Sequence, residues 1–174
     1  METIIVYTIG HSTRTIEEFL RLLQAHSVEQ VADVRTVPRS RHNPQFNRET
    51  LPASLAEAGI GYVHLAELGG LRKPLPDSNN AAWKNASFRG YADYMQTPEF
   101  AAGLDHLLEL AREHPTVVMC AEAVPWRCHR SLIGDALTVR GINVEDILSE
   151  TRRSPHRMTP FAHVEDERVT YPQA

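Results

Sequence analysis

Apolar residues form short continuous runs that alternate with segments of helical spacing. The runs of strand length cover residues 3–9, 28–34, 62–65, 116–121 and 143–148. Runs of this kind, rich in β-branched residues, are typical of strands buried on both faces of a parallel sheet. Strands that alternate with helices are joined by right-handed crossovers. The pattern predicts a single α/β domain over residues 1–174, with three α/β/α layers and a mainly parallel sheet of about five strands.

Helices are predicted between these strands from the spacing of leucines and from residues that favour helix starts. The first helix begins after Ser12, Thr13 or Thr15, because hydroxyl side chains cap helix N-termini. The others cover residues 49–58 and 83–95, begin at Pro98, and begin at Pro125 or Trp126. We also expect a C-terminal hairpin over residues 161–171 that turns near Asp166.

Composition narrows the class of protein. The 174 residues carry a net charge of −4 and contain no apolar run of the roughly 20 residues that a membrane span needs. The first residues have no basic segment, so a signal peptide is not predicted. Only Cys120 and Cys128 could form a disulfide, and without export signals we expect reduced thiols. We therefore expect a soluble cytoplasmic protein that does not bind membranes.

Basic side chains nevertheless gather in three loops. The first loop runs from Arg35 to Arg48 and contains no acidic residue. The second contains Arg127, His129 and Arg130, and the third contains Arg152, Arg153, His156 and Arg157. Local basic loops in an acidic protein indicate anion sites rather than a general affinity for polyanions.

Polar residues end three of the predicted strands. These ends are residues 10–12 (Gly-His-Ser), 33–35 (Asp-Val-Arg) and 120–122 (Cys-Ala-Glu). Ligands of open parallel sheets bind outside the carboxyl ends of the strands, and a helix N-terminus favours an anion there. We therefore predict that His11, Arg35, Glu122 and Arg127 line one shared cleft.

The residue types suggest roles within this cleft. We assign proton transfer to His11 and Glu122, include Asp33 and Cys128 among the catalytic candidates, and predict no metal site; the sequence identifies no cofactor. The anion-binding candidates are Ser12, Arg35, Arg39, Arg41, Arg127, His129 and Arg130. Two structural alternatives stay open: residues 10–12 could form only a turn and a helix cap, and Asp33 could pair only with Arg35.

The two cysteines have different predicted environments. Cys120 lies inside an apolar strand, where burial suppresses ionisation, and we expect a small core residue. Cys128 falls in the first turn of the predicted helix beside three basic residues, which favours a thiolate. We predict that Cys128 is the more reactive thiol; the alternative is that Cys128 faces inward and is inert.

Several motifs with known chemistry do not fit. No GxGxxG follows the first strand and no GxxxxGK[ST] occurs. Six residues separate Cys120 from Arg127, whereas a cysteine-phosphatase loop has five. The histidines and cysteines lack zinc-ligand spacing.

Short segments spread over nearly the whole chain resemble DUF488, a bacterial and archaeal family of unknown function. They are Tyr7–Ser12, Asp33–Arg41, Leu68–Gly70, Met119–Glu122, Cys128–Arg130, and the tail from Ser154 to Pro172. The resemblance implies an α/β fold and no particular reaction.

Three functional hypotheses remain. The preferred one is an enzyme, a hydrolase or transferase, acting on a phosphate-bearing or other anionic small molecule or nucleotide, with Arg35, Arg127 and Arg130 as clamps. The second is a nucleic-acid-associated protein in repair or a stress response, whose binding should weaken steeply with salt. The third is a non-catalytic sensor of an anionic ligand. The sequence does not indicate an oligomeric state.

Overall fold

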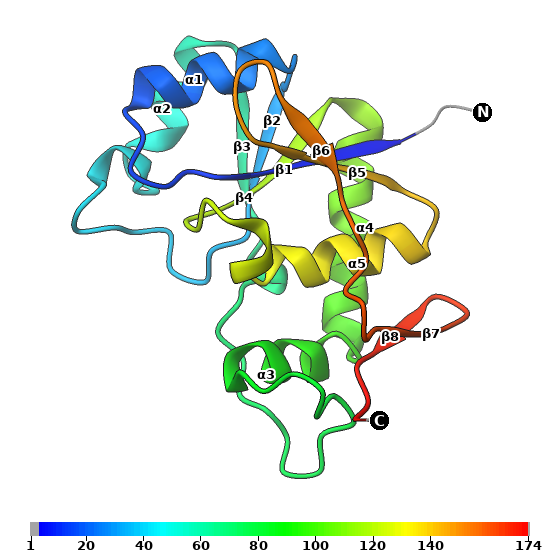
Figure 1. The fold of residues 1–174 in the computed structure, drawn as a ribbon. Coiled ribbons are helices and arrows are strands. Elements are labelled where there is room, and N and C mark those ends of the chain that lie inside the picture. The colour runs from blue at the N-terminus through cyan, green and yellow to red at the C-terminus, as the bar shows by residue number, and fades with distance from the viewer. Residues whose placement is uncertain (1–3, 174) are drawn as a thin grey trace.

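The computed structural model describes residues 4–173 and contains a six-stranded sheet (Figure 1). The strands are β1 (Ile5–Gly10), β2 (Gln30–Asp33), β3 (Gly61–His64), β4 (Thr116–Cys120), β5 (Asn143–Ile147) and β6 (Arg153–Pro155). Their order is β3-β2-β4-β1-β5-β6, in which the first five are parallel and β6 is antiparallel to β5. Strand β4 thus lies at the centre, between β2 and β1.

Helices cover both faces of this sheet, which gives the predicted three layers. The helices are α1 (Ile16–Ala25), α2 (Leu51–Glu57), α3 (Ala86–Tyr94), α4 (Pro98–Glu113) and α5 (Arg130–Val139). Alternate residues of β4 show the division. Val117 and Met119 pack in the core with α1 and α2, whereas Val118 and Cys120 pack in the core with α3, α4 and α5.

The α/β class, the mainly parallel sheet and the C-terminal hairpin are confirmed. The hairpin pairs β7 (His163–Glu165) with β8 (Arg168–Thr170), and Asp166 takes a positive φ of 55° at its turn. Strand β6 was not predicted, because a three-residue polar edge strand has no hydrophobic alternation. The start of α5 is a second difference: residues 125–127 form a separate 3₁₀ turn, and α5 begins only at Arg130.

A buried carboxylate attaches the C-terminal segment to α5. Asp135 is fully buried, and Tyr171 donates its hydroxyl proton to Asp135 over 2.7 Å. Thr159 donates to the same carboxylate through its hydroxyl and its backbone N–H, and the His156 Nε2 lies 2.8 Å away. A buried charge needs such partners, so this network holds the tail against the domain.

None of the helices within residues 4–173 has the length and apolar character that crossing a bilayer requires.

Candidate functional site

The carboxyl ends of β1, β2 and β4 meet at one edge of the sheet, as predicted. His11 donates its backbone N–H to the Cys120 carbonyl over 2.9 Å, and Val34 donates to the Met119 carbonyl over 3.0 Å. Gly10 allows the close approach of the loop after β4, because a Cβ there would lie 1.8 Å from the Glu122 carbonyl oxygen. The sequence therefore predicts the correct edge of the sheet. Gly10 explains how the loop after β1 and the loop after β4 can lie so close together.

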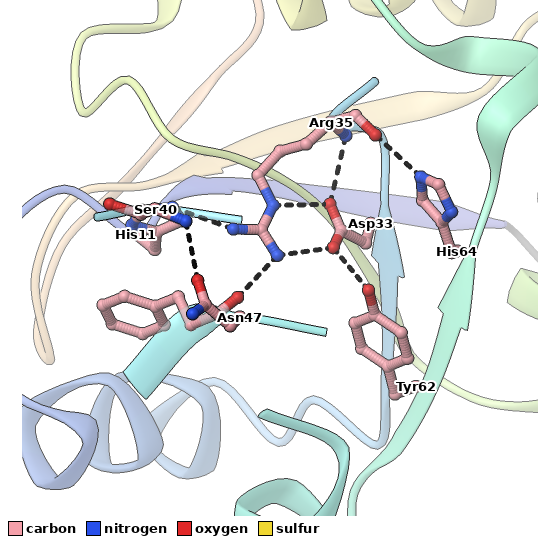
Figure 2. Close-up of polar contacts among 8 residues, drawn as sticks. His11, Asp33, Arg35, Ser40, Asn47, Tyr62 and His64 are labelled. Carbon is pink, nitrogen blue, oxygen red and sulfur yellow. Dashed lines mark hydrogen bonds and ion pairs between the residues drawn. The ribbon is translucent and has the colours of Figure 1, made fainter. Parts of the chain in front are cut away.

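Asp33 and Arg35 form a buried ion pair at this edge (Figure 2). The Arg35 guanidinium donates to both carboxylate oxygens of Asp33, over 2.9 and 2.7 Å, and to the Phe46 carbonyl over 2.7 Å. The Tyr62 hydroxyl also donates to Asp33. Asp33 and Arg35 thus form the structural pair that was one of the two alternatives. Most N–H groups of the Arg35 guanidinium already have a hydrogen-bond partner in the protein.

His11 lies behind this pair, in the protein interior. Its ring stacks on Phe46 with centroids 4.3 Å apart, and its Nε2 is 3.4 Å from Arg35 Nη1. Burial lowers the pKa of His11 to about 4, so the ring is neutral near pH 7. The neutral His11 ring therefore packs against the Arg35 guanidinium and can accept a hydrogen bond from its Nη1.

A pocket of about 500 Å³ opens at the carboxyl ends of β2 and β4. Three of the four residues predicted to share a cleft line it, namely Arg35, Glu122 and Arg127. His11 is not among the lining residues. Further wall residues come from the loops after β2 and η2 (Ala66–Leu68) and from the start of α3: Thr36, Val37, Gly70, Leu71, Asn85, Ser87 and Phe88. Cys120, Ala121, Cys128 and His129 complete the lining.

The two cysteines are in direct contact at the base of this pocket. The Cys128 thiol donates to the Cys120 sulfur over 2.7 Å, and both residues are buried. Both are free thiols. Cys128 precedes α5 rather than lying in its first turn, and its sulfur accepts the backbone N–H of Arg130, the first residue of the helix, over 3.5 Å. A pair of contacting thiols just before the helix thus takes the place of a single reactive Cys128 in the first helical turn, which was expected from the sequence.

Arg130 places a positive charge against this pair. Its Nη1 donates to the Cys120 sulfur over 3.2 Å and to the Glu122 carbonyl over 2.9 Å, and its Nη2 donates to the Ala123 carbonyl over 3.0 Å. Arg130 is 2% exposed, and within residues 4–173 it forms no ion pair with a carboxylate. Its Nε is buried without a hydrogen-bond partner.

These contacts separate the acidities of the two thiols. Burial raises the pKa of Cys120, but the Cys128 hydrogen bond and the Arg130 charge outweigh burial and leave this pKa below its ordinary value. The contact with Cys120, together with burial, raises the pKa of Cys128 well above its ordinary value. The electrostatics therefore favour a Cys120 thiolate, the reverse of the order expected from the sequence.

His129 is fixed in a neutral form beside the thiols. Its Nε2 lies 3.0 Å from the Val34 carbonyl, which can only accept, so Nε2 carries the proton. Nδ1 is then an acceptor, 3.5 Å from the Cys128 sulfur. Burial lowers the pKa of His129 to about 4. Gly70 makes room for this ring, since a Cβ there would lie 2.6 Å from Nδ1.

The remaining site candidates are spread over the surface near this edge. Arg39 is exposed and lies 3.7 Å from Glu49, and Arg41 is exposed; neither lines the pocket. Ser12 is partly buried and has a positive φ of 52°, and it does not cap α1, because Thr15 does. The exposed Glu122 accepts the backbone N–H of Val124 over 3.1 Å. The structure thus gathers the thiols, His129, Arg130 and Arg127 and leaves Arg39 and Arg41 apart.

A comparison with protein-family models decides the family. The model described as "Domain of unknown function DUF488" matches residues 15–137. The chain belongs to the DUF488 family. No curated protein and no solved structure matches the chain. The matched region includes both cysteines, His129, Arg130 and the Asp33–Arg35 pair, whereas His11 and the C-terminal tail lie outside it.

The thiol pair and the α3 side of the pocket were not predicted from the sequence of this DUF488 chain. The position of the cysteines contained a usable signal: Cys120 ends a strand and Cys128 precedes the next helix, so the βα connection can bring the two together. Asn85, Ser87 and Phe88 come from a segment far away along the chain, and no spacing indicates their approach. Among the described residues, no group of three or more His, Cys, Asp or Glu side chains is arranged to hold a metal ion.

Proposed function

We propose that this DUF488 protein is an enzyme that acts on a small anionic substrate through a nucleophilic Cys120 thiolate. The observation that supports the proposal is the buried Arg130 guanidinium, which contacts the Cys120 sulfur and has no carboxylate partner in the described chain. An uncompensated buried charge is costly, and a Cys120 thiolate supplies the missing negative charge. Arg130 is therefore a positioning residue that keeps the nucleophile ionised, which differs from the substrate clamp expected from the sequence.

The thiolate enables a two-step transfer. The Cys120 sulfur attacks an electrophilic carbon or phosphorus of the substrate, forming a bond to sulfur while the leaving group departs with the bonding electron pair. The leaving group takes up a proton from water at the pocket mouth. Water or a second acceptor then displaces the sulfur and regenerates the thiolate, and the exposed Glu122 carboxylate takes up the proton that this acceptor loses and passes it to solvent. The reaction class is that of a hydrolase or a transferase.

The pocket wall supports a substrate with an anionic group and an apolar part. Arg127 is exposed at the mouth and forms no ion pair within residues 4–173, so its guanidinium is free for an anion. Val37 and Leu71 are 60% and 73% exposed beside it, which favours apolar contact. Arg35 is bound by Asp33 and contributes mainly to the shape of the wall. The nucleic-acid and sensor hypotheses stay predictions.

Selective alkylation tests the nucleophile. We expect iodoacetamide to modify Cys120 in the folded protein near pH 7 and to leave Cys128 largely unmodified, as mapped by peptide mass spectrometry. The Cys128→Ser variant keeps the Arg130 contact and should still be alkylated at Cys120. Modification of Cys128 alone, or protection of both thiols up to pH 9, would contradict the proposal.

A further inference from the structure

We infer that Cys120 and Cys128 form a reversible dithiol–disulfide couple that reduces small hydroperoxides. This second activity of the site rests on the Cys120 thiolate of the proposed function. It is carried by the contact between the two sulfurs and by the Arg130 guanidinium that lies against one of them. A group-transfer enzyme needs one nucleophilic thiol, so the Cys128 sulfur, which donates a hydrogen bond to Cys120, forms no bond to the substrate in that reaction.

The positions of the two cysteines favour bond formation. Cys120 ends the central strand β4, and Cys128 lies in the short connection before α5. Their sulfurs are 2.7 Å apart, whereas a disulfide bond is roughly 2.0 Å long, so a small displacement is enough. The connection between them is irregular apart from the 3₁₀ turn of residues 125–127, and it can absorb that displacement without disturbing a helix or strand.

The reaction begins when the Cys120 thiolate attacks the terminal oxygen of a hydroperoxide. The S–O bond forms, the O–O bond breaks, and the alkoxide or hydroxide that leaves takes up a proton. Cys120 is now a sulfenic acid. The Arg130 guanidinium stabilises the Cys120 thiolate before this step and can orient the leaving oxygen, since its Nη1 donates to that sulfur. The backbone N–H of Arg130 donates instead to the Cys128 sulfur.

Cys128 completes the oxidation. Its sulfur attacks the Cys120 sulfur, the S–S bond forms, and the hydroxide that leaves takes the Cys128 proton and departs as water. The acceptor Nδ1 of His129, 3.5 Å from the Cys128 sulfur, can relay that proton. In sum the dithiol and one hydroperoxide give the disulfide, one alcohol or water, and one further water. Two equivalents of a small thiol then restore the dithiol and become a disulfide themselves.

The burial of the two thiols limits the size of the oxidant that can reach them. Cys120 and Cys128 are 2% and 7% exposed at the base of the pocket, so only a small or narrow oxidant reaches the sulfur. Hydrogen peroxide and short alkyl hydroperoxides meet this requirement. A resolving thiol in direct contact also captures the sulfenic acid before a second peroxide can oxidise it further.

Peptide mapping under non-reducing conditions tests the couple. The full-length protein is treated with hydrogen peroxide, blocked with N-ethylmaleimide and digested. We expect an intramolecular Cys120–Cys128 cross-link lacking the two thiol hydrogens, which a small thiol such as dithiothreitol reverses. In Cys128→Ser the cross-link is lost and Cys120 appears as a dimedone-trapped sulfenic acid or as the sulfinic acid. In Cys120→Ser the cross-link is lost and peroxide is no longer consumed.

Two outcomes would overturn the inference. One is a parent protein whose Cys120 is alkylated by iodoacetamide but accumulates sulfinic acid without a cross-link, which leaves the proposed transferase or hydrolase intact. The other is a cross-link only between two copies of the chain. If Cys120 resists both alkylation and peroxide, the thiolate itself is absent and the proposed function fails as well. Circular dichroism of each variant separates these results from misfolding.

Discussion

Arg130 shows how a single buried side chain can determine the chemistry around it. Its guanidinium has two backbone carbonyls and a sulfur as partners. Carbonyls satisfy its N–H groups but supply no net charge, so the sulfur is the group that can balance it. The acidity of Cys120 therefore depends on a residue ten positions further along the chain.

Replacing Arg130 should raise the pKa of Cys120. In Arg130→Met we expect the midpoint of the pH profile for iodoacetamide alkylation of Cys120 to move to higher pH, since a neighbouring positive charge is lost. Arg130→Lys should shift the midpoint less, because a charge remains. Arg48→Met is a matched control, because Arg48 is exposed and belongs to a different loop. An unchanged midpoint in Arg130→Met would show that the thiolate does not depend on this arginine.

At the residue scale, the residues at the strand ends could be predicted from the sequence, whereas the contacts between their side chains could not. His11, Arg35 and Glu122 were expected at one edge because parallel strands end on the same side. The burial of His11 and Arg130 could not be read from the sequence, because it depends on Phe46 stacking and on the path of residues 121–123. The contact of Cys120 with Cys128 depends on the same path.

At the scale of elements, caps and turns decided where helices begin. Helix α1 starts after Thr15, whose hydroxyl accepts the backbone N–H of Glu18 while the Glu18 carboxylate accepts that of Thr15. This reciprocal capping fits one of the three starts that the sequence allowed. Helix α5 started later than expected, because Pro125 opens a 3₁₀ turn that ends at Arg127. A proline suits the first turn of either kind of helix, so the sequence did not distinguish them.

Removing the α1 cap should destabilise the domain. For Thr15→Ala we expect the free energy of unfolding to fall by about 0.5–2 kcal/mol, measured by urea denaturation, because the backbone N–H of Glu18 loses its hydroxyl partner. Thr13→Ala is the control, since Thr13 is exposed and forms no hydrogen bond in the described structure. Equal losses in the two variants would argue against the cap.

At the scale of the whole molecule, the buried His11 and the partly buried His129 link stability to pH. Burial lowers the pKa of His11 and of His129 to about 4 in the folded protein, whereas an unfolded histidine titrates near 6.5. Between these values the unfolded chain binds more protons than the folded one. Stability is therefore full above about pH 6.5 and falls as the pH drops towards 4.

A histidine variant can isolate this effect. We expect the unfolding free energy of the parent to decrease between pH 7 and pH 4.5, by up to about 1.4 kcal/mol per pH unit for each histidine. His11→Asn should show a shallower decrease, because one of the two groups is gone. His106→Asn, at an exposed position, should follow the parent. Identical slopes for the parent and His11→Asn would exclude His11 as a source of the acid sensitivity.

The buried carboxylate of Asp135 affects the order in which parts of the chain can fold while the protein is being synthesised. Its partners His156, Thr159 and Tyr171 all follow it along the chain. While a ribosome is still adding these residues, full packing of α5 would bury a carboxyl group without its hydrogen-bond partners, which is unfavourable. We expect strands β1 to β4 to pair before α5 packs, because the partners of Asp135 come later in the chain. We therefore expect the pocket, whose thiols lie just before α5, to be completed only after residues 156–171 have been synthesised.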